Sequence, residues 1–200
     1  MREPFCEFVK TKLRPRTLLI TCGLPGTWKT ETAEEIAKIK GFSILRTDLI
    51  RLEVLKGEDV FDEKIAADMT KRLSVYDEMF RRAAAVLANN KSVILDATFV
   101  TQELRRRAAE IAASHNVSLV ILQTRCSEEV SLKRISKRSK EEYESNALTP
   151  EAYYNNKKKF EPVNISDLKK TFPSVEIVHL IVDTEYDDPE DWYVIGFEKM

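Results

Sequence analysis

The chain has 200 residues, of which 43% are hydrophobic and 32% are charged, a balance that excludes an intrinsically disordered protein. Lysine and arginine number 32 against 33 acidic residues, and the net charge of −1 excludes a strongly basic coat for nucleic acid but not a local basic patch. Its 3 cysteines are too few and too scattered to predict a disulfide framework or a zinc site. Because no apolar run approaches the ~20 residues that cross a bilayer, we expect a cytoplasmic protein without a membrane partner.

Short apolar runs alternate along the chain with segments of helical periodicity. The predicted strands are Thr17–Thr21, Phe42–Leu45, Ser92–Leu95, Val117–Leu122 and Val175–Val182. The predicted helices are Thr30–Lys40, Glu63–Ala88, Thr101–Ser114, one capped by Ser127 and one that Thr149 and Pro150 open. Near-continuous apolar runs indicate strands that are buried on both faces of a parallel sheet. We therefore predict a three-layer α/β/α fold in a single domain over residues 1–200, with a core at about 16–183 and an acidic and aromatic tail at 184–200 that packs back onto it.

A glycine-containing loop follows the first predicted strand and leads into the first predicted helix. It reads Gly-Leu-Pro-Gly-Thr-Trp-Lys-Thr, from Gly23 to Thr30. Strand, glycine loop, Lys-Thr pair and helix, in this order, are typical of a loop that holds a nucleoside triphosphate through its main-chain N–H groups. The expected binding residues are Gly23, Pro25, Gly26, Thr27, Trp28, Lys29 and Thr30. Lys29 can reach the β- and γ-phosphates, and the Thr30 hydroxyl can hold Mg²⁺.

Trp28 stands where the usual motif has a glycine just before the lysine. A positive φ at that position costs a bulky residue about 1–2 kcal/mol. Either the loop adopts another backbone conformation there, or the strain is tolerated because the indole stacks on a neighbour. A third interpretation is a degenerate loop that binds no nucleotide. We expect Trp28 to lie near bound nucleotide.

Carboxylates follow two of the predicted strands. Asp48 comes shortly after the second strand, with Arg51 three residues later, and Asp96 closes the third. Ligands of open α/β sheets bind at the carboxyl ends of the strands, so both carboxylates are candidate site residues. Asp48 could orient or deprotonate an acceptor hydroxyl, or it could simply cap a helix. Asp96 is expected beside Mg²⁺, together with Thr30.

The segment 125–140 is locally basic, with six cationic and two anionic side chains. Arg134 and Arg138 are four residues apart and are predicted to share a helix face. Phosphoryl transfer depends on positive charge around the phosphates, so these arginines are candidates for a lid that closes over them. The alternative is an ordinary solvated, charged helix.

Taken together, these motifs resemble the phosphate-loop kinases grouped with zeta toxins, polynucleotide 5′-kinases and the ATP-binding halves of certain small-molecule phosphotransferases. The resemblance rests on residues 23–30, 47–51, 92–99, the arginines at 134 and 138, and the run at 145–162, which fall in the family's order. It implies an adenylate-kinase-like core with a parallel five-stranded sheet in the order 2-3-1-4-5 and a helical lid. It also implies ATP with Mg²⁺ as donor and a hydroxyl acceptor, either a small metabolite or an RNA or DNA 5′ end.

The resemblance further implies roles for single residues. Asp48 matches the acceptor-activating aspartate, Arg51 the substrate-positioning arginine, and Arg134 and Arg138 the lid arginines, with Lys29 as the catalytic lysine of the loop. Two functions follow as hypotheses. The first is an ATP-dependent kinase that phosphorylates a hydroxyl. The second is a nucleotide-binding regulatory protein with a degenerate loop and little or no turnover.

Overall fold

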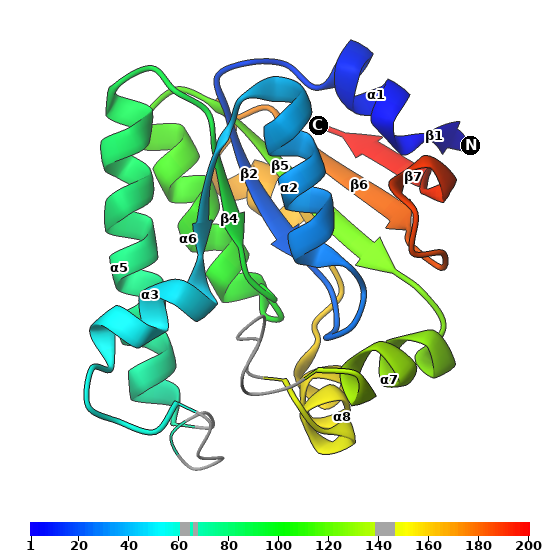
Figure 1. Ribbon diagram of the computed structural model, residues 1–200. Helices are drawn as coiled ribbons and strands as arrows, with labels where there is room; N and C mark the ends of the chain where they lie inside the picture. Colours follow the sequence, from blue (N-terminus) through cyan, green and yellow to red (C-terminus); the bar gives the residue numbers. More distant parts are fainter. Residues whose placement is uncertain (61–64, 66–67, 139–146) are drawn as a thin grey trace.

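The structure is a computed structural model that describes residues 1–60, 65, 68–138 and 147–200 (Figure 1). In this part of the chain a seven-stranded sheet has the order β1-β7-β6-β5-β2-β4-β3. Its parallel strands are β2 (Thr17–Cys22), β3 (Ser43–Arg46), β4 (Val93–Asp96), β5 (Ser118–Arg125) and β6 (Ile177–Asp183). These are the five predicted strands, and their arrangement β3-β4-β2-β5-β6 confirms the expected order 2-3-1-4-5.

Two antiparallel strands extend the sheet beyond the prediction. β7 (Tyr193–Lys199) pairs with β6, and β1 (Glu3–Pro4) pairs with β7. The tail therefore packs back onto the core as expected, but it does so as a strand. Trp192 and Val194 are buried, whereas Ile195 and Phe197 are exposed.

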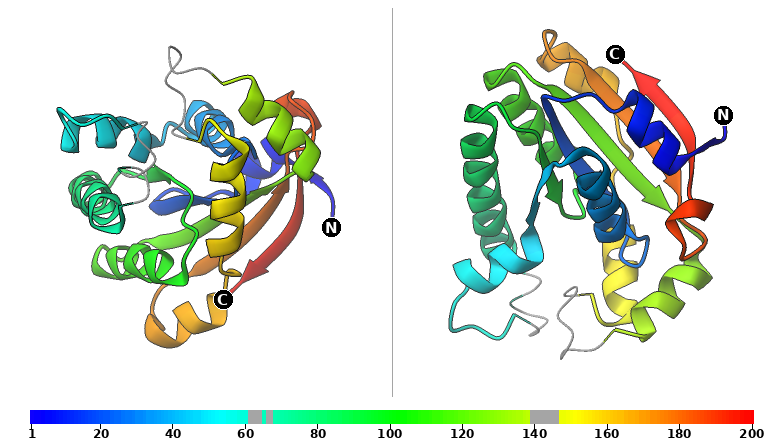
Figure 2. Two further views of the ribbon diagram at one scale, coloured as in Figure 1. Left: turned by 90° about the horizontal axis from the view of Figure 1, so that it is seen from below. Right: turned by 45° about the horizontal axis from the view of Figure 1, so that its top comes forward.

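Helices cover both faces of the sheet, which explains why the central strands β2, β4 and β5 are almost entirely buried (Figure 2). On one face lie α1 (Phe5–Lys12) and α2 (Lys29–Lys40), and on the other lie α5 (Met69–Ala88), α6 (Gln102–Ser114) and α9 (Ile165–Thr171). All six residues of β2 are buried, with Leu18 and Ile20 in one core cluster and Leu19 in the other. The predicted start of the α5 helix at Glu63 lies outside the described residues, and Asp68 caps the described helix. None of the helices in the described ranges is both long and apolar enough to cross a membrane.

Three further helices lie at the carboxyl end of the parallel strands (Figure 1). They are α3 (Thr47–Val54), α7 (Glu128–Ser136) and α8 (Pro150–Lys159). As predicted, Ser127 caps α7 and Thr149 caps α8 through its side-chain oxygen. Glu128 of α7 accepts hydrogen bonds from Tyr154 and Lys157 of α8, which joins the two helices.

Arg105 of α6 connects the end of α8 to the segment after β4. Its side chain is fully buried. It donates to the Phe99 carbonyl oxygen at 3.0 Å, and to those of Glu161 and Pro162 at 2.8 and 3.1 Å. A guanidinium can satisfy several carbonyl oxygens at once because it carries five N–H donors. One buried side chain thus joins two segments that are about 60 residues apart in sequence.

Candidate functional site

The loop between β2 and α2 depends on glycine at two positions. Gly23 has φ +143° and Gly26 has φ +81°, both in the region that side chains rarely adopt. A Cβ on Gly26 would lie 2.5 Å from the Ser131 carbonyl oxygen of α7, and one on Gly23 would lie 2.8 Å from that of Thr124. The two glycines let the loop run against α7 and the end of β5.

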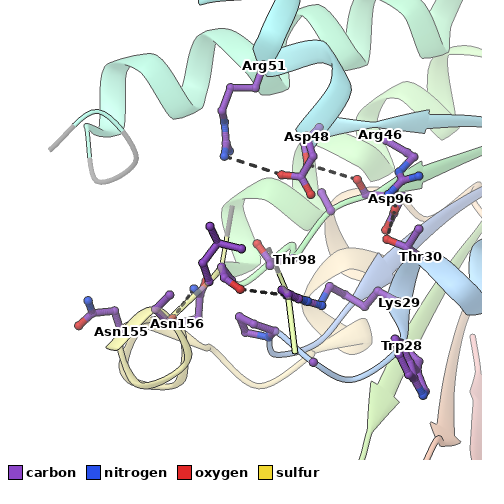
Figure 3. A pocket seen from close by; sticks show the side chains of 18 of the residues that line it. Trp28, Lys29, Thr30, Arg46, Asp48, Arg51, Asp96, Thr98, Asn155 and Asn156 are labelled. Carbon is purple, nitrogen blue, oxygen red and sulfur yellow. Dashed lines mark hydrogen bonds and ion pairs between the residues drawn. The ribbon is translucent and has the colours of Figure 1, made fainter. Parts of the chain in front are cut away.

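Lys29 and Thr30 begin α2 directly after this loop. The Lys29 ammonium reaches across the loop and donates to the Leu24 carbonyl oxygen at 2.7 Å. The Thr30 hydroxyl donates to Asp96 Oδ2 at 2.6 Å (Figure 3). The Thr21 hydroxyl donates to Asp96 Oδ1 at 3.2 Å. Burial lowers the pKa of Lys29, and the nearby Asp96 carboxylate partly offsets this. The structure therefore brings the two predicted metal-binding residues together beside the loop lysine.

Asp48 lies across the pocket in the first turn of α3, which begins directly after β3 (Figure 3). Its Oδ1 lies 3.8 Å from Nη1 of Arg51, one helical turn further on. Burial raises the pKa of Asp48, and the Arg51 guanidinium acts in the opposite direction. Because Arg46 occupies the cap position of α3, the capping role considered for Asp48 is not supported.

A pocket of about 720 Å³ connects the two groups at the carboxyl edge of the sheet. The predicted site residues that line it are Pro25, Gly26, Trp28, Lys29, Thr30, Asp48, Arg51, Asp96 and Arg138. Of the predicted site residues, all of which lie in the described ranges, Gly23, Thr27 and Arg134 are outside this lining. Gly23 and Thr27 are buried in the base of the loop.

Several lining residues were not predicted from the sequence. They are Glu31 and Glu34 of α2, Arg72 and Tyr76 of α5, Thr98 after β4, and Asn155, Asn156 and Lys159 of α8. Glu31 follows the Lys-Thr pair, and its burial raises its pKa to about 6. Its position directly after the Lys-Thr pair could have predicted that Glu31 lies in the pocket. No local signal marks the residues of α5 and α8, because only the fold brings them to the loop.

The two predicted lid arginines lie in different places. Helix α7 ends at Ser136, so Arg138 follows the helix instead of sharing a face with Arg134. Arg138 lines the pocket and donates through Nη1 to the Ala147 carbonyl oxygen at 3.1 Å. Arg134 is only 6% exposed and lies against the loop, where its Nη1 donates to the Gly26 carbonyl oxygen at 3.2 Å.

Trp28 adopts the left-handed conformation, with φ 55° and ψ 39°. Cζ of Arg134 lies 4.5 Å from the centre of the indole ring, and the indole N–H donates to Asp187 Oδ1 at 3.2 Å. Of the alternatives considered for this position, the structure thus contains the strained backbone with a stacked indole. Cation–π contacts and hydrogen bonds contribute about 0.5–2 kcal/mol each, which is comparable with the strain.

A parallel sheet in this order, with a glycine loop leading into a helix at its carboxyl edge, defines a phosphate-loop nucleotide-binding fold. Residues 18–163 match the model of a family of AAA domains, and the chain belongs to that family. Uncharacterized proteins of Mycobacterium bovis and Mycobacterium tuberculosis are 30% identical over 115 residues, which is 55% of this chain and 23% of those proteins. The chain therefore corresponds to a minor part of these longer relatives.

Solved structures, among them two kinases, share the fold. A gluconokinase from Sinorhizobium meliloti has a TM-score of 0.57 and 17% identity, with 86% of this chain and 85% of that chain covered. A sugar kinase from Janibacter has a TM-score of 0.58 and 16% identity over 88% and 89% of the two chains. Kti12 of Chaetomium thermophilum, in complex with ADP-AlF3, has a TM-score of 0.55 and 18% identity over 74% and 82%. These likenesses show that the chain has the fold of phosphate-loop kinases.

Proposed function

We propose that the protein is an ATP-dependent kinase that transfers the γ-phosphate to a hydroxyl group. The observation that carries this proposal is the composition of one pocket. Lys29, Thr30 and Asp96 form its phosphate-loop wall, and Asp48 with Arg51 faces them across the cavity. A donor polyphosphate and an acceptor hydroxyl can therefore meet between the two groups.

The loop wall suits a polyphosphate. The start of α2 presents main-chain N–H groups and the positive end of the helix dipole to the pocket. The Lys29 ammonium is partly buried beside the loop and already binds one oxygen, the carbonyl of Leu24. Phosphate oxygens would replace that carbonyl oxygen and restore the pKa that burial lowers. Arg138, which also lines the pocket, supplies a further positive charge there.

The side chains of Thr30 and Asp96 fit a magnesium ion. Their hydroxyl and carboxylate oxygens lie 2.6 Å apart and belong to the hard oxygen donors that Mg²⁺ prefers. In this role Thr30 and Asp96 would hold the ion directly or through water. When bound, Mg²⁺ neutralises the charge on the transferring phosphoryl group.

Asp48 is the proposed acceptor-activating residue. Burial raises its pKa, which brings the carboxylate closer to the basicity needed to accept a hydroxyl proton. Arg51, 3.8 Å away, keeps the carboxylate oriented and compensates its charge. The amide side chains of Asn155 and Asn156 in the same lining suit an acceptor with several hydroxyls. Together with the gluconokinase and sugar kinase folds, this favours a small polyhydroxylated metabolite over a nucleic-acid 5′ end.

An acceptor screen with labelled ATP tests the proposal. Sugars, sugar acids, nucleosides and oligonucleotides with 5′-hydroxyl ends would be compared as acceptors. We expect Lys29→Ala to abolish Mg-ATP binding, and Asp48→Asn to lower the transfer rate by about 10²–10⁴-fold with Mg-ATP affinity unchanged. Asp77→Asn, on the exposed surface of α5, serves as the matched control.

The outcomes separate the candidate functions. Unchanged Mg-ATP binding by Lys29→Ala would remove the basis for a nucleotide site. Full transfer activity of Asp48→Asn would refute its role as the base. The strained conformation of Trp28 favours the regulatory alternative. Tight Mg-ATP binding without transfer to any acceptor would support that alternative against the kinase.

A further inference from the structure

Arg134 connects the phosphate loop to the segment that follows β6. Its Nη2 donates to the carbonyl oxygens of residues 184–186 at 2.9, 3.1 and 3.2 Å. Nε and Nη2 both donate to Asp187 Oδ1, at 3.1 and 2.9 Å. Nη1 donates to the Gly26 carbonyl oxygen of the loop. The donors of this buried guanidinium are therefore directed at the chain itself and not at the pocket.

The same segment holds the loop at two further points. The Thr184 hydroxyl donates to the Thr27 carbonyl oxygen at 3.0 Å. The Asp187 carboxylate accepts from the indole N–H of Trp28, whose ring lies on the Arg134 guanidinium. Three successive loop residues, 26–28, are thus attached to α7 and to the segment 184–187. Figure 3 shows the side chains of Trp28 and Lys29 leaving the main chain in different directions, with Lys29 toward Thr98.

The contact with Trp28 matters because that residue is strained. With φ 55°, a tryptophan occupies a conformation that glycine adopts without penalty. Such a conformation persists only where the surroundings hold it. The Arg134 guanidinium stacked on the indole and the Asp187 carboxylate that accepts its N–H stabilise this conformation. If they are lost, the adjacent main-chain N–H groups and Lys29 are free to leave the arrangement that faces the pocket.

We infer that Asp187 and Arg134 are positioning residues, which hold Trp28 in its left-handed conformation and so fix the phosphate loop in its binding shape. The inference rests on nucleotide binding at the proposed site. It assigns a part in that binding to the segment 184–187, which lies beyond residues 18–163 that the family model matches. It also gives Arg134 a role through the loop instead of direct contact with the phosphates.

The first test compares Asp187→Ala with the matched control Asp191→Ala, an exposed aspartate four residues further on. Calorimetry would measure the affinity for Mg-ATP and for magnesium tripolyphosphate, which lacks the base and sugar. Because the Asp187 side chain is 73% exposed, we expect the variant to fold normally. The expected loss is about five- to tenfold for both ligands, the size typical of one lost hydrogen bond, and none for the control.

A double-mutant cycle with Trp28→Gly tests the route of the effect. Glycine adopts a positive φ without strain, so Asp187→Ala should weaken binding by less than about twofold in that background. A spectroscopic measurement tests the contact itself without any ligand. The indole N–H resonance of Trp28, assigned by its absence in Trp28→Phe, should shift and exchange faster with solvent in Asp187→Ala.

Three results would overturn the positioning role while wild-type binding stays intact. The first is an affinity of Asp187→Ala equal to that of the wild type. The second is an equal loss of affinity with tryptophan and with glycine at position 28. The third is a loss of affinity for Mg-ATP alone, which would mean that Asp187 contacts the base or sugar directly. Failure of the wild-type protein to bind either ligand refutes the proposed function, and the role of the loop with it. The two failures are therefore distinguishable.

Discussion

Gly26→Ala is expected to be strongly destabilising, because this glycine lets the phosphate loop lie against α7. The added Cβ would stand 2.5 Å from the Ser131 carbonyl oxygen and 3.0 Å from its Cα. Both atoms belong to the main chain of a helix, so they cannot rotate away as a flexible side chain would. Ser131 is fully buried, and the helix must therefore shift as a unit.

Two contributions add up to the expected loss of stability in Gly26→Ala. The positive φ of +81° costs an alanine about 1–2 kcal/mol, and overpacking of a buried contact adds about 1–3 kcal/mol. The free energy of unfolding should fall by about 2–5 kcal/mol. Gly41→Ala is the matched control, because Gly41 has a φ of +70° and no atom within 4 Å of an added Cβ. The free energy of unfolding of Gly41→Ala should fall only by the backbone cost of a positive φ, about 1–2 kcal/mol.

Urea unfolding of both variants, followed by circular dichroism, measures the difference. In a domain of this size each 1 kcal/mol also lowers the melting temperature by about 2–4 °C. We expect Gly26→Ala to melt clearly below Gly41→Ala and to bind Mg-ATP more weakly, since α7 carries Arg134. Equal stability of the two variants would refute the close approach of loop and helix.

Two further predictions concern pH. Burial raises the pKa of Glu31 to about 6 from 4.5. Because the folded state binds this proton more tightly than the unfolded state, the free energy of unfolding falls by about 2 kcal/mol as pH rises from 4.5 to 6. Glu31→Gln should remove that loss and be about 1–2 kcal/mol more stable than the wild type at pH 7 in urea titrations, with no gain at pH 4. Burial lowers the pKa of His179 to about 4 from 6.5. Because the unfolded state takes up this proton more readily than the folded state, the free energy of unfolding falls by about 3 kcal/mol as pH falls from 6.5 to 4. His179→Gln should flatten the melting temperature over this range, and an unchanged acid profile would contradict the assignment.

The parallel core could be predicted because its physical signal is local. A strand covered on both faces needs apolar residues at every position, and β2 shows this in six consecutive buried residues. Helix α1 was missed although Phe5, Phe8 and Val9 are spaced by three and four, because eight residues give too short a pattern. β7 was missed as a strand because its pairing with β6 and β1 is set by the fold, and the acidic segment before it suggested surface chain.

In the site too, residues with a local sequence signal could be predicted, and residues that only the fold brings together could not. Asp48 and Asp96 come from strand ends, and the carboxyl ends of parallel strands share one edge, so sequence order alone brings them to the loop. Arg134 shows where this reasoning stops. A charged helix predicts exposure, whereas its carbonyl partners lie about 50 residues further along and are brought to it only by the fold. The same holds for the α8 residues of the pocket wall.

The buried guanidinium of Arg105 has a mechanical consequence for that wall. It fastens the carboxyl end of α8 to the segment after β4, through Phe99 and Glu161. Tyr154 and Lys157 of the same helix bind instead to Glu128 of α7. We therefore expect a motion that widens or narrows the cavity at α8 to pivot near the buried Arg105, with α7 linked to α8 only by exposed contacts.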